Sequence, residues 1–166
     1  MKEMTKANTQ AAFAGESQAH MRYLVFANVA EREGLANIAR LFRAVSYAEE
    51  KHATAHLRSL GGLKTTVDNL ETAIGGETFE VDEMYPAYMA VAKLQEEKQA
   101  LTGMERAFEA EKMHAKIYAR AKESAATKKD LDLGSIFICE NCGWTVEAAT
   151  APAECPLCGW TKFRQF

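Results

Sequence analysis

The stretch Glu-Glu-Lys-His at 49–52, repeated as Glu-Lys-Met-His at 111–114, decides the fold of this chain, because each copy places a glutamate three residues before a histidine. On a helix, residues at positions i and i+3 point the same way, so each copy offers a carboxylate and an imidazole to one point. Two such helices, with further inward carboxylates, are how four-helix bundles bind pairs of iron or manganese ions. The repeated motif therefore predicts an all-α four-helix bundle with a two-metal site.

Glu16 strengthens this prediction, which a single glutamate–histidine pair would support only weakly because solvated helix faces also carry such pairs. Phe13 and Tyr23 share the helix face of Glu16 and direct it inward. A buried lone carboxylate is costly, and a metal dication is one of the few partners that offset the cost. Glu77 and Glu80 repeat the spacing of three, although acidic residues are also common in a first helical turn for dipole reasons.

The predicted ligand set combines carboxylates with imidazoles: Glu16, Glu49, Glu77, Glu80, Glu111, His52 and His114. Hard oxygen ligands with some imidazole suit iron or manganese. His20 and His56 each follow a predicted ligand by four residues, and we interpret them as neighbours of the site or surface residues. Tyr23 and Tyr85 are candidates for phenols that hydrogen-bond a ligand or a bound oxygen species, or else ordinary core residues.

All four cysteines lie in two Cys-x-x-Cys pairs, Cys139 with Cys142 and Cys155 with Cys158. In a reducing cytosol this spacing predicts a metal site rather than disulfides. A glycine follows each pair and lets backbone amides turn towards the sulfurs. Four thiolates bind either structural zinc or a single redox iron, and the cysteine pattern alone does not separate the two. The surrounding aromatic residues favour iron.

The chain divides by composition into a bundle at 1–128, a polar linker at 129–136 and a module at 137–166 that depends on its metal to fold. Periodicity predicts helices over about 6–33, 36–60, 77–99 and 101–126. Residues 61–76 are expected to form a long connection that could hold a short helical turn and that ends in Gly75-Gly76. Pro86 is expected to bend the third helix or mark a restart.

Composition excludes several classes of protein. The 166 residues are 48% hydrophobic and 26% charged, which is ordinary for a soluble globular protein. A net charge of −3 provides no basic footprint for nucleic acid and no polybasic membrane anchor. No apolar run is long enough to span a bilayer, and residues 1–5 lack the apolar segment of a signal peptide. We expect a cytoplasmic protein without nucleic-acid or membrane partners.

Over nearly its full length the chain resembles the rubrerythrin family, whose members join a ferritin-like di-iron bundle to a C-terminal rubredoxin-like domain. The resemblance lies in Ala14-Gly15-Glu16-Ser17-Gln18-Ala19, the two Glu-x-x-His motifs, Gly76-Glu77-x-x-Glu80, Glu83-Met84-Tyr85-Pro86 and the four-cysteine tail. Their order and spacing match, and the combination is highly specific. Rubrerythrins are non-haem di-iron proteins that reduce hydrogen peroxide to water.

The resemblance implies that the seven residues above are the di-iron ligands, with Glu49 and Glu111 bridging. It implies that one iron changes partner between Glu80 and His52 with redox state, and that the four cysteines hold a single iron that passes electrons inward. Zinc could substitute at either site. An external donor, such as rubredoxin or an NAD(P)H-linked reductase, would re-reduce the protein.

Family members form homodimers, some with exchanged helices, or higher homo-oligomers, in which the rubredoxin-like centre serves the other subunit. A linker too short to fold back freely agrees with this arrangement. One departure from the family concerns the end of the third helix. The first half of the chain turns at Glu33-Gly34, whereas the second half has Gln95-Glu96-Glu97-Lys98, which leaves that end undefined.

The predicted function is a peroxidase that defends the cell against oxidative stress. The first alternative is a ferroxidase or iron-storage protein, since ferritins share the bundle and its ligands, but storage has no need of a built-in four-cysteine electron donor. A zinc-ribbon interaction protein with a purely structural bundle is the second alternative, and it would leave Glu16 and the repeated motif unexplained.

Overall fold

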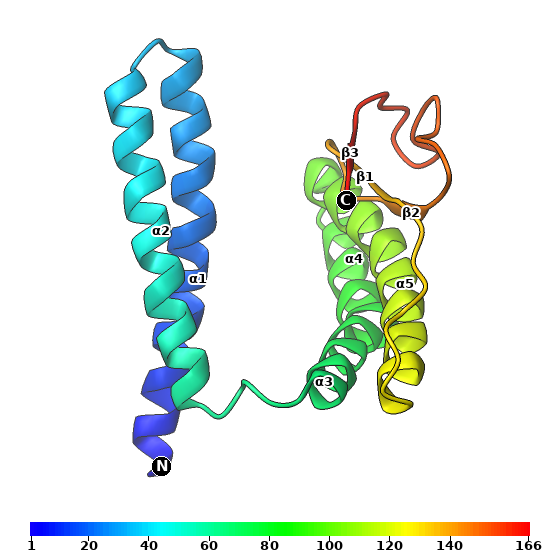
Figure 1. Cartoon of the computed structure of the whole chain (residues 1–166). Coiled ribbons are helices and arrows are strands. Elements are labelled where there is room, and N and C mark those ends of the chain that lie inside the picture. Colours follow the sequence, from blue (N-terminus) through cyan, green and yellow to red (C-terminus); the bar gives the residue numbers. More distant parts are fainter. The chain divides into compact units, whose positions relative to one another are not determined.

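The computed structural model describes all 166 residues and is mainly helical, as predicted (Figure 1). It divides into two compact units, unit 1 (Met1–Lys64) and unit 2 (Thr65–Phe166), and each is described by itself. The elements are α1 (Glu3–Arg32), α2 (Ala36–Ser59), α3 (Thr66–Phe79), η1 (Glu80–Met84), α4 (Tyr85–Leu94), α5 (Lys98–Ala126), β1 (Ile136–Cys139), β2 (Thr145–Glu147) and β3 (Phe163–Gln165). None of the helices combines the length and the apolar character that crossing a membrane requires. The domain boundaries at 128 and 137 stay a prediction.

Unit 1 is a hairpin of two long helices, α1 and α2, joined by a tight turn at Gly34 (Figure 1). Gly34 has a φ of 78°, the left-handed conformation that ends a helix without strain from a Cβ atom. The buried side chains of the hairpin are all small: Ala27, Ala30, Ala39, Ser46 and Ala53. Larger apolar side chains, including Phe26, Val29 and Leu41, remain exposed. The hairpin therefore has an apolar face that it does not bury by itself.

The connection between the two units is shorter than predicted, because α3 begins at Thr66 and not near residue 77. Thr65 caps the helix, and its hydroxyl oxygen accepts the backbone N–H of Asp68 at 3.2 Å. Gly75 and Gly76 lie inside α3 instead of ending the connection. A glycine weakens a helix interior by about 1 kcal/mol relative to alanine. This cost is too small to end α3 at the glycines, because the helix is capped at its start and packs against α5.

A five-residue π-helix, η1, joins α3 to α4 in front of Pro86. The N–H of Tyr85 bonds to the carbonyl of Glu80, five residues back. Proline has no N–H to donate, and its ring crowds the carbonyl four residues before it, so a wider turn accommodates Pro86 without a break. The predicted restart is not seen, because the backbone stays helical on both sides of η1.

The end of α4 resembles the end of α1, although no glycine is present. Glu96 has a φ of 59° and takes the place in this turn that Gly34 takes in the first. In both turns an N–H bonds to a carbonyl five residues back: Leu35 to Ala30 at 2.8 Å and Glu97 to Ala92 at 2.9 Å. The third predicted helix therefore ends at Leu94, and not near residue 99, with a strained glutamate in the left-handed position.

The C-terminal module is a three-stranded antiparallel sheet in the order β2-β1-β3, and it folds back on α5 of its own chain. Lys128, with a φ of 58°, reverses the chain just after the helix ends. The hydroxyl of Ser124 then donates to the carbonyl of Asp130 at 2.8 Å, which holds the linker against the helix. The prediction that the linker is too short to fold back freely was wrong, because the chain already reverses at Lys128, just after α5 ends.

Candidate metal centres

Unit 1 brings three predicted ligands together in a first cluster, Glu16, Glu49 and His52, which we call cluster 1. Each contributes one ligand atom, and these atoms lie within 4.8 Å of one another. Glu16 comes from α1, while Glu49 and His52 lie one turn apart on α2, where the spacing of three aligns them. His52 Nδ1 lies 2.8 Å from Glu49 Oε2, and 58% of the His52 side chain is exposed.

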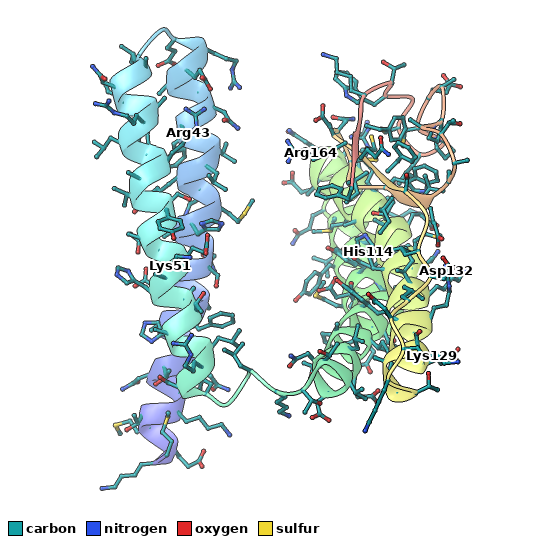
Figure 2. The ribbon with its side chains drawn as sticks, in the orientation of Figure 1. Arg43, Lys51, His114, Lys129, Asp132 and Arg164 are labelled. Carbon is teal, nitrogen blue, oxygen red and sulfur yellow. The ribbon has the colours of Figure 1, made fainter.

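Unit 2 repeats the arrangement in a second cluster, Glu77, Glu111 and His114, which we call cluster 2. Its ligand atoms also lie within 4.8 Å of one another. His114 lies on α5 (Figure 2). Its Nδ1 lies 2.6 Å from Oε2 of Glu111, one turn before it on the same helix. Glu80, also predicted as a ligand, is not part of this close group, but its charge raises the pKa of Glu77. The structure therefore brings six of the seven predicted carboxylate and imidazole ligands into two like sets and leaves Glu80 beside the second.

The carboxylates of cluster 2 repel one another. Burial, a hydrogen bond with Glu111 and the negative charges of Glu111 and Glu80 raise the pKa of Glu77 to about 7. Burial and the negative charge of Glu111 also raise the pKa of Glu80 above its usual value. No lysine or arginine is among the causes of either shift, and only His114 partly offsets the rise at Glu80. A divalent metal ion would supply the missing positive charge, and the donor set suits iron.

Tyr85, a candidate for a phenol near the metal site, lies beside cluster 2. Burial and then the charges of Glu80, Glu111 and Glu77 raise the pKa of its hydroxyl above the usual value. Tyr85 therefore keeps its proton at neutral pH. Tyr23 has a different setting, because its ring packs with Phe26 and Phe42 at centroid distances of 6.2 and 6.1 Å. The second interpretation of the tyrosines, an ordinary packing residue, therefore describes Tyr23 better.

His20 joins the two helices of unit 1. Its Nδ1 donates to the carbonyl of Ser46 at 2.9 Å, and the buried Ser46 hydroxyl donates to the carbonyl of His20 at 2.9 Å. These bonds fix the pairing of α1 with α2 close to cluster 1. The interpretation that His20 lies outside the ligand set fits this geometry, since its Nδ1 already has a backbone partner.

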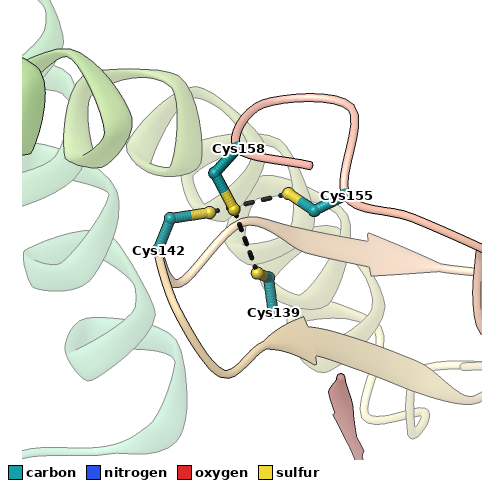
Figure 3. Close-up of side chains that lie close together, drawn as sticks. All are labelled: Cys139, Cys142, Cys155 and Cys158. Atoms are coloured by element: carbon teal, nitrogen blue, oxygen red, sulfur yellow. Dashed lines mark hydrogen bonds between the residues drawn. The ribbon is translucent and has the colours of Figure 1, made fainter. Parts of the chain in front are cut away.

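The four cysteine sulfurs converge on one point in the C-terminal module (Figure 3). The Sγ atoms of Cys139 and Cys158 lie 3.6 Å apart, and so do those of Cys142 and Cys155. A disulfide would need about 2.05 Å. A tetrahedral ion with metal–sulfur bonds of about 2.3 Å has sulfur–sulfur edges of about 3.8 Å. The observed separations therefore fit a four-thiolate metal site.

Two equivalent backbone turns build this site. The N–H of Gly143 bonds to the carbonyl of Cys139 at 3.0 Å, and that of Gly159 bonds to Cys155 at 2.8 Å. Both glycines are left-handed, with φ of 77° and 71°, as the glycine after each Cys-x-x-Cys pair predicts. Burial alone would raise the pKa of Cys158, but hydrogen bonds from the Asn141 side chain, the Trp160 backbone and the thiols of Cys142 and Cys139 together outweigh burial and lower the pKa to about 6. One cysteine is thus a thiolate at neutral pH, ready to bind a cation.

The four-cysteine module contacts cluster 2 through residues that the sequence does not single out. His114 Nε2 lies 2.8 Å from the hydroxyl of Thr145 on β2. Arg120 pairs with Glu147, also on β2, at 2.6 Å, and Glu147 accepts the backbone N–H of Gly134 at 2.9 Å. A threonine, an arginine and a glutamate at these positions carry no motif, so only the tertiary structure reveals the contact.

Comparison with known proteins agrees with this geometry. The family described as Rubrerythrin matches residues 8–122, and the family described as the rubredoxin-like domain of rubrerythrin matches residues 137–164. The chain belongs to the rubrerythrin family. The resemblance inferred from sequence is therefore confirmed, together with the helical fold and its rubredoxin-like module. Rubrerythrins are in general oxidoreductases, and membership supports iron as the metal of these sites.

Relatives cover the chain almost end to end. Rubrerythrin-2 of Clostridium acetobutylicum is 40% identical over 96% of this chain and 94% of its own length. Nigerythrin of Nitratidesulfovibrio vulgaris is 32% identical over 93% of this chain and 81% of its own. Among solved structures, nigerythrin in its fully reduced, all-ferrous state matches with a TM-score of 0.55 and 29% identity, over 98% of this chain and 86% of that one.

Proposed function

We propose that clusters 1 and 2 together hold a di-iron site. The two clusters would come either from one chain or from two copies of it. The ligands would be Glu16, Glu49, His52, Glu77, Glu80, Glu111 and His114. Each cluster offers only two carboxylates and one imidazole, so carboxylates shared between two ions would complete both coordination shells. The exposed apolar face of the α1–α2 hairpin supports this pairing, because burial of such faces drives helix association.

The function that the site supports best is a peroxidase that reduces hydrogen peroxide to two waters. This reaction consumes two electrons and two protons, and two ferrous ions held by the carboxylates and imidazoles of the clusters would supply one electron each. Tyr85 is our candidate for a proton donor, because its phenol is protonated and lies beside the carboxylates of cluster 2. Glu80 and His52 are the ligands expected to exchange as the redox state changes. Tyr23 remains a weaker candidate for a catalytic phenol because its ring packs with Phe26 and Phe42.

The observation that carries this proposal is the contact between the four-cysteine module and a ligand of cluster 2. A site that only stores iron does not need a second, thiolate-bound metal next to its ligands. Here Thr145 of the module is hydrogen-bonded to His114. An iron held by the four cysteines would pass electrons to cluster 2, and an external donor such as rubredoxin or an NAD(P)H-linked reductase would replace them. Zinc in the module would block this route.

Rapid mixing tests the peroxidase. The fully reduced, iron-loaded protein is mixed with hydrogen peroxide without oxygen, and the absorbance of ferric carboxylate and ferric thiolate centres is followed separately. We expect rapid oxidation at the clusters, and then the appearance of ferric-thiolate absorbance as the iron held by the cysteines gives up its electron to them. Tyr85→Phe should slow the first phase with little effect on metal content. Iron that stays ferrous in the presence of peroxide would refute the proposal.

The same preparation separates the alternatives. A peroxidase should carry about three irons per chain, two at the carboxylate clusters and one at the four thiolates. Faster oxidation by dioxygen than by peroxide, with ferric mineral accumulating, would instead indicate a ferroxidase or storage protein. A colourless protein with zinc at the cysteines would remove the electron relay from the proposal.

A further inference from the structure

The contact between His114 and Thr145 fixes which ring nitrogen of the histidine faces the carboxylates. Nδ1 lies 2.6 Å from Glu111 and Nε2 lies 2.8 Å from the Thr145 hydroxyl oxygen, so the ring is held from both sides. Glu111 and His114 lie one turn apart on α5, whereas Thr145 belongs to the four-cysteine module. The histidine is thus shared between the helix and the module.

The direction of the second hydrogen bond follows from the single proton of the Thr145 hydroxyl. That hydroxyl donates to the carbonyl of Gly143 at 3.0 Å, and a carbonyl can only accept. The oxygen of Thr145 must therefore accept from His114, so Nε2 carries a hydrogen. The remaining nitrogen, Nδ1, is then free to bind a metal between itself and Glu111. Thr145 is only 4% exposed, so water does not compete readily for its oxygen.

A second pair holds the module in place for this contact. Arg120 lies six residues, or nearly two turns, beyond His114 on α5 and pairs with Glu147, two residues beyond Thr145 on β2. This pair lies at the surface and adds little stability, but it sets the register of β2 along the helix. Cluster 1 differs, since within its hairpin His52 is hydrogen-bonded only to Glu49 and is more exposed than His114.

We propose that Thr145 is a positioning residue of the carboxylate–histidine metal site. Its hydroxyl, presented by the four-cysteine module of the same chain, accepts the Nε2–H of His114 and so directs Nδ1 to the metal. This inference rests on the proposed function for the role of His114 as an iron ligand. Its consequence is a coupling between the metal sites: the module needs its own metal to fold, and a folded module supplies the partner of His114.

The test compares Thr145→Val, which keeps the shape but removes the hydroxyl, with Thr145→Ser, which restores it. The full chain is used with its four-cysteine site filled, and the visible spectrum of that centre confirms that the module is folded. Cobalt(II) is then titrated into the carboxylate–histidine site, where its absorption bands differ from those of a thiolate complex. Thr150→Val is the matched control, because Thr150 lies in the same module and is exposed.

We expect Thr145→Val to weaken cobalt binding about 10- to 100-fold, the usual effect of removing a partner of a metal-bound histidine. Thr145→Ser and Thr150→Val should stay within about threefold of the wild type. In the zinc-loaded wild type, nitrogen NMR should show His114 with its hydrogen on Nε2 and the metal on Nδ1. This measurement uses only the wild type, so it tests the proposal even if Thr145→Val does not fold. Equal affinity of wild type and Thr145→Val, or a hydrogen on Nδ1, would overturn the role of Thr145 and leave the di-iron proposal standing. Failure of the wild type to bind cobalt outside the four-cysteine site would overturn both.

Discussion

Replacing Glu77 by glutamine should stabilise the metal-free protein at high pH and weaken the metal-loaded protein. Burial, followed by the hydrogen bond with Glu111 and the charges of Glu111 and Glu80, raises the pKa of Glu77 from 4.5 to about 7, so the folded state binds its proton more tightly than the unfolded state does. The stability associated with this proton is fully present below pH 4.5 and is lost as the pH rises to about 7. At pH 8 the folded, metal-free protein therefore carries an unfavourable charge that Glu77→Gln removes.

The size of the effect follows from the same shift. A rise from 4.5 to about 7 corresponds to at most about 3.4 kcal/mol, at about 1.4 kcal/mol per pKa unit. Because Glu77 is only partly buried, solvent screens much of this repulsion, and we expect a gain of about 1 kcal/mol at pH 8 and almost none at pH 5. Once metal is bound, the same substitution removes a ligand, so the sign should reverse.

Urea denaturation of the chelator-treated protein at pH 5 and pH 8, at one fixed protein concentration, measures the gain. The iron- or zinc-loaded protein measures its reversal. Glu83→Gln is the matched control, because Glu83 is an exposed glutamate on the same helical stretch. A destabilised metal-free Glu77→Gln variant at pH 8 would refute the view that Glu77 is held in a repulsive cluster awaiting a cation. Stabilisation of both forms would show that Glu77 is not a ligand.

Three further predictions follow from the structure. Glu96→Gly should raise the free energy of unfolding by about 1 kcal/mol, because Glu96 has a φ of 59° and glycine adopts this left-handed backbone without strain. Gly34→Ala should lower the free energy of unfolding by a similar amount, because Gly34 has a φ of 78°, and thermal melts of both variants measure the changes. Cys142→Ser should abolish the absorbance of the thiolate iron and slow re-reduction of the clusters by an external donor. The carboxylate clusters should still bind iron when it is supplied in excess, although cluster 2 should bind it more weakly once the contact with Thr145 is lost; intact turnover would contradict the relay. Metal binding at cluster 2 should release more protons at pH 6 than at pH 8, because Glu77 with a pKa of about 7 is largely protonated only at the lower pH; calorimetry in buffers of different ionisation enthalpy measures the difference.

The sequence predicts the parts of the metal centres that depend on local spacing. The Glu-x-x-His motifs lie on helices, where a spacing of three aligns their side chains, and the Cys-x-x-Cys-Gly pairs form turns whose geometry the glycine sets. The helix boundaries in the middle of the chain were predicted less well. Gly75-Gly76 suggested a connection, but the cap at Thr65 and packing on α5 keep that segment helical. Weak helix formers in a sequence predict a break, but they do not show whether tertiary contacts will outweigh their low helix propensity.

Contacts between residues that belong to no motif could not be predicted. Thr145 lies 31 positions from His114, and no spacing rule links a strand of the module to a helix of the bundle. The same is true of Glu96, whose left-handed backbone the sequence could not distinguish from a continuing helix. In both cases the outcome depends on where the folded chain places the residue, and composition and periodicity do not encode that position.

The repeated motif produces two histidines that are chemically unequal. His114 is bonded at both ring nitrogens and is 30% exposed, whereas His52 is bonded only to Glu49 within its hairpin and is 58% exposed. A ligand held on two sides has little freedom to leave a metal, while one held on a single side can rotate away at the cost of one hydrogen bond. This inequality agrees with the proposal that His52, and not His114, exchanges with a glutamate as the redox state changes. The four-cysteine module would thus do more than deliver electrons, because its contact with His114 makes one half of a duplicated site rigid and leaves movement to the other half.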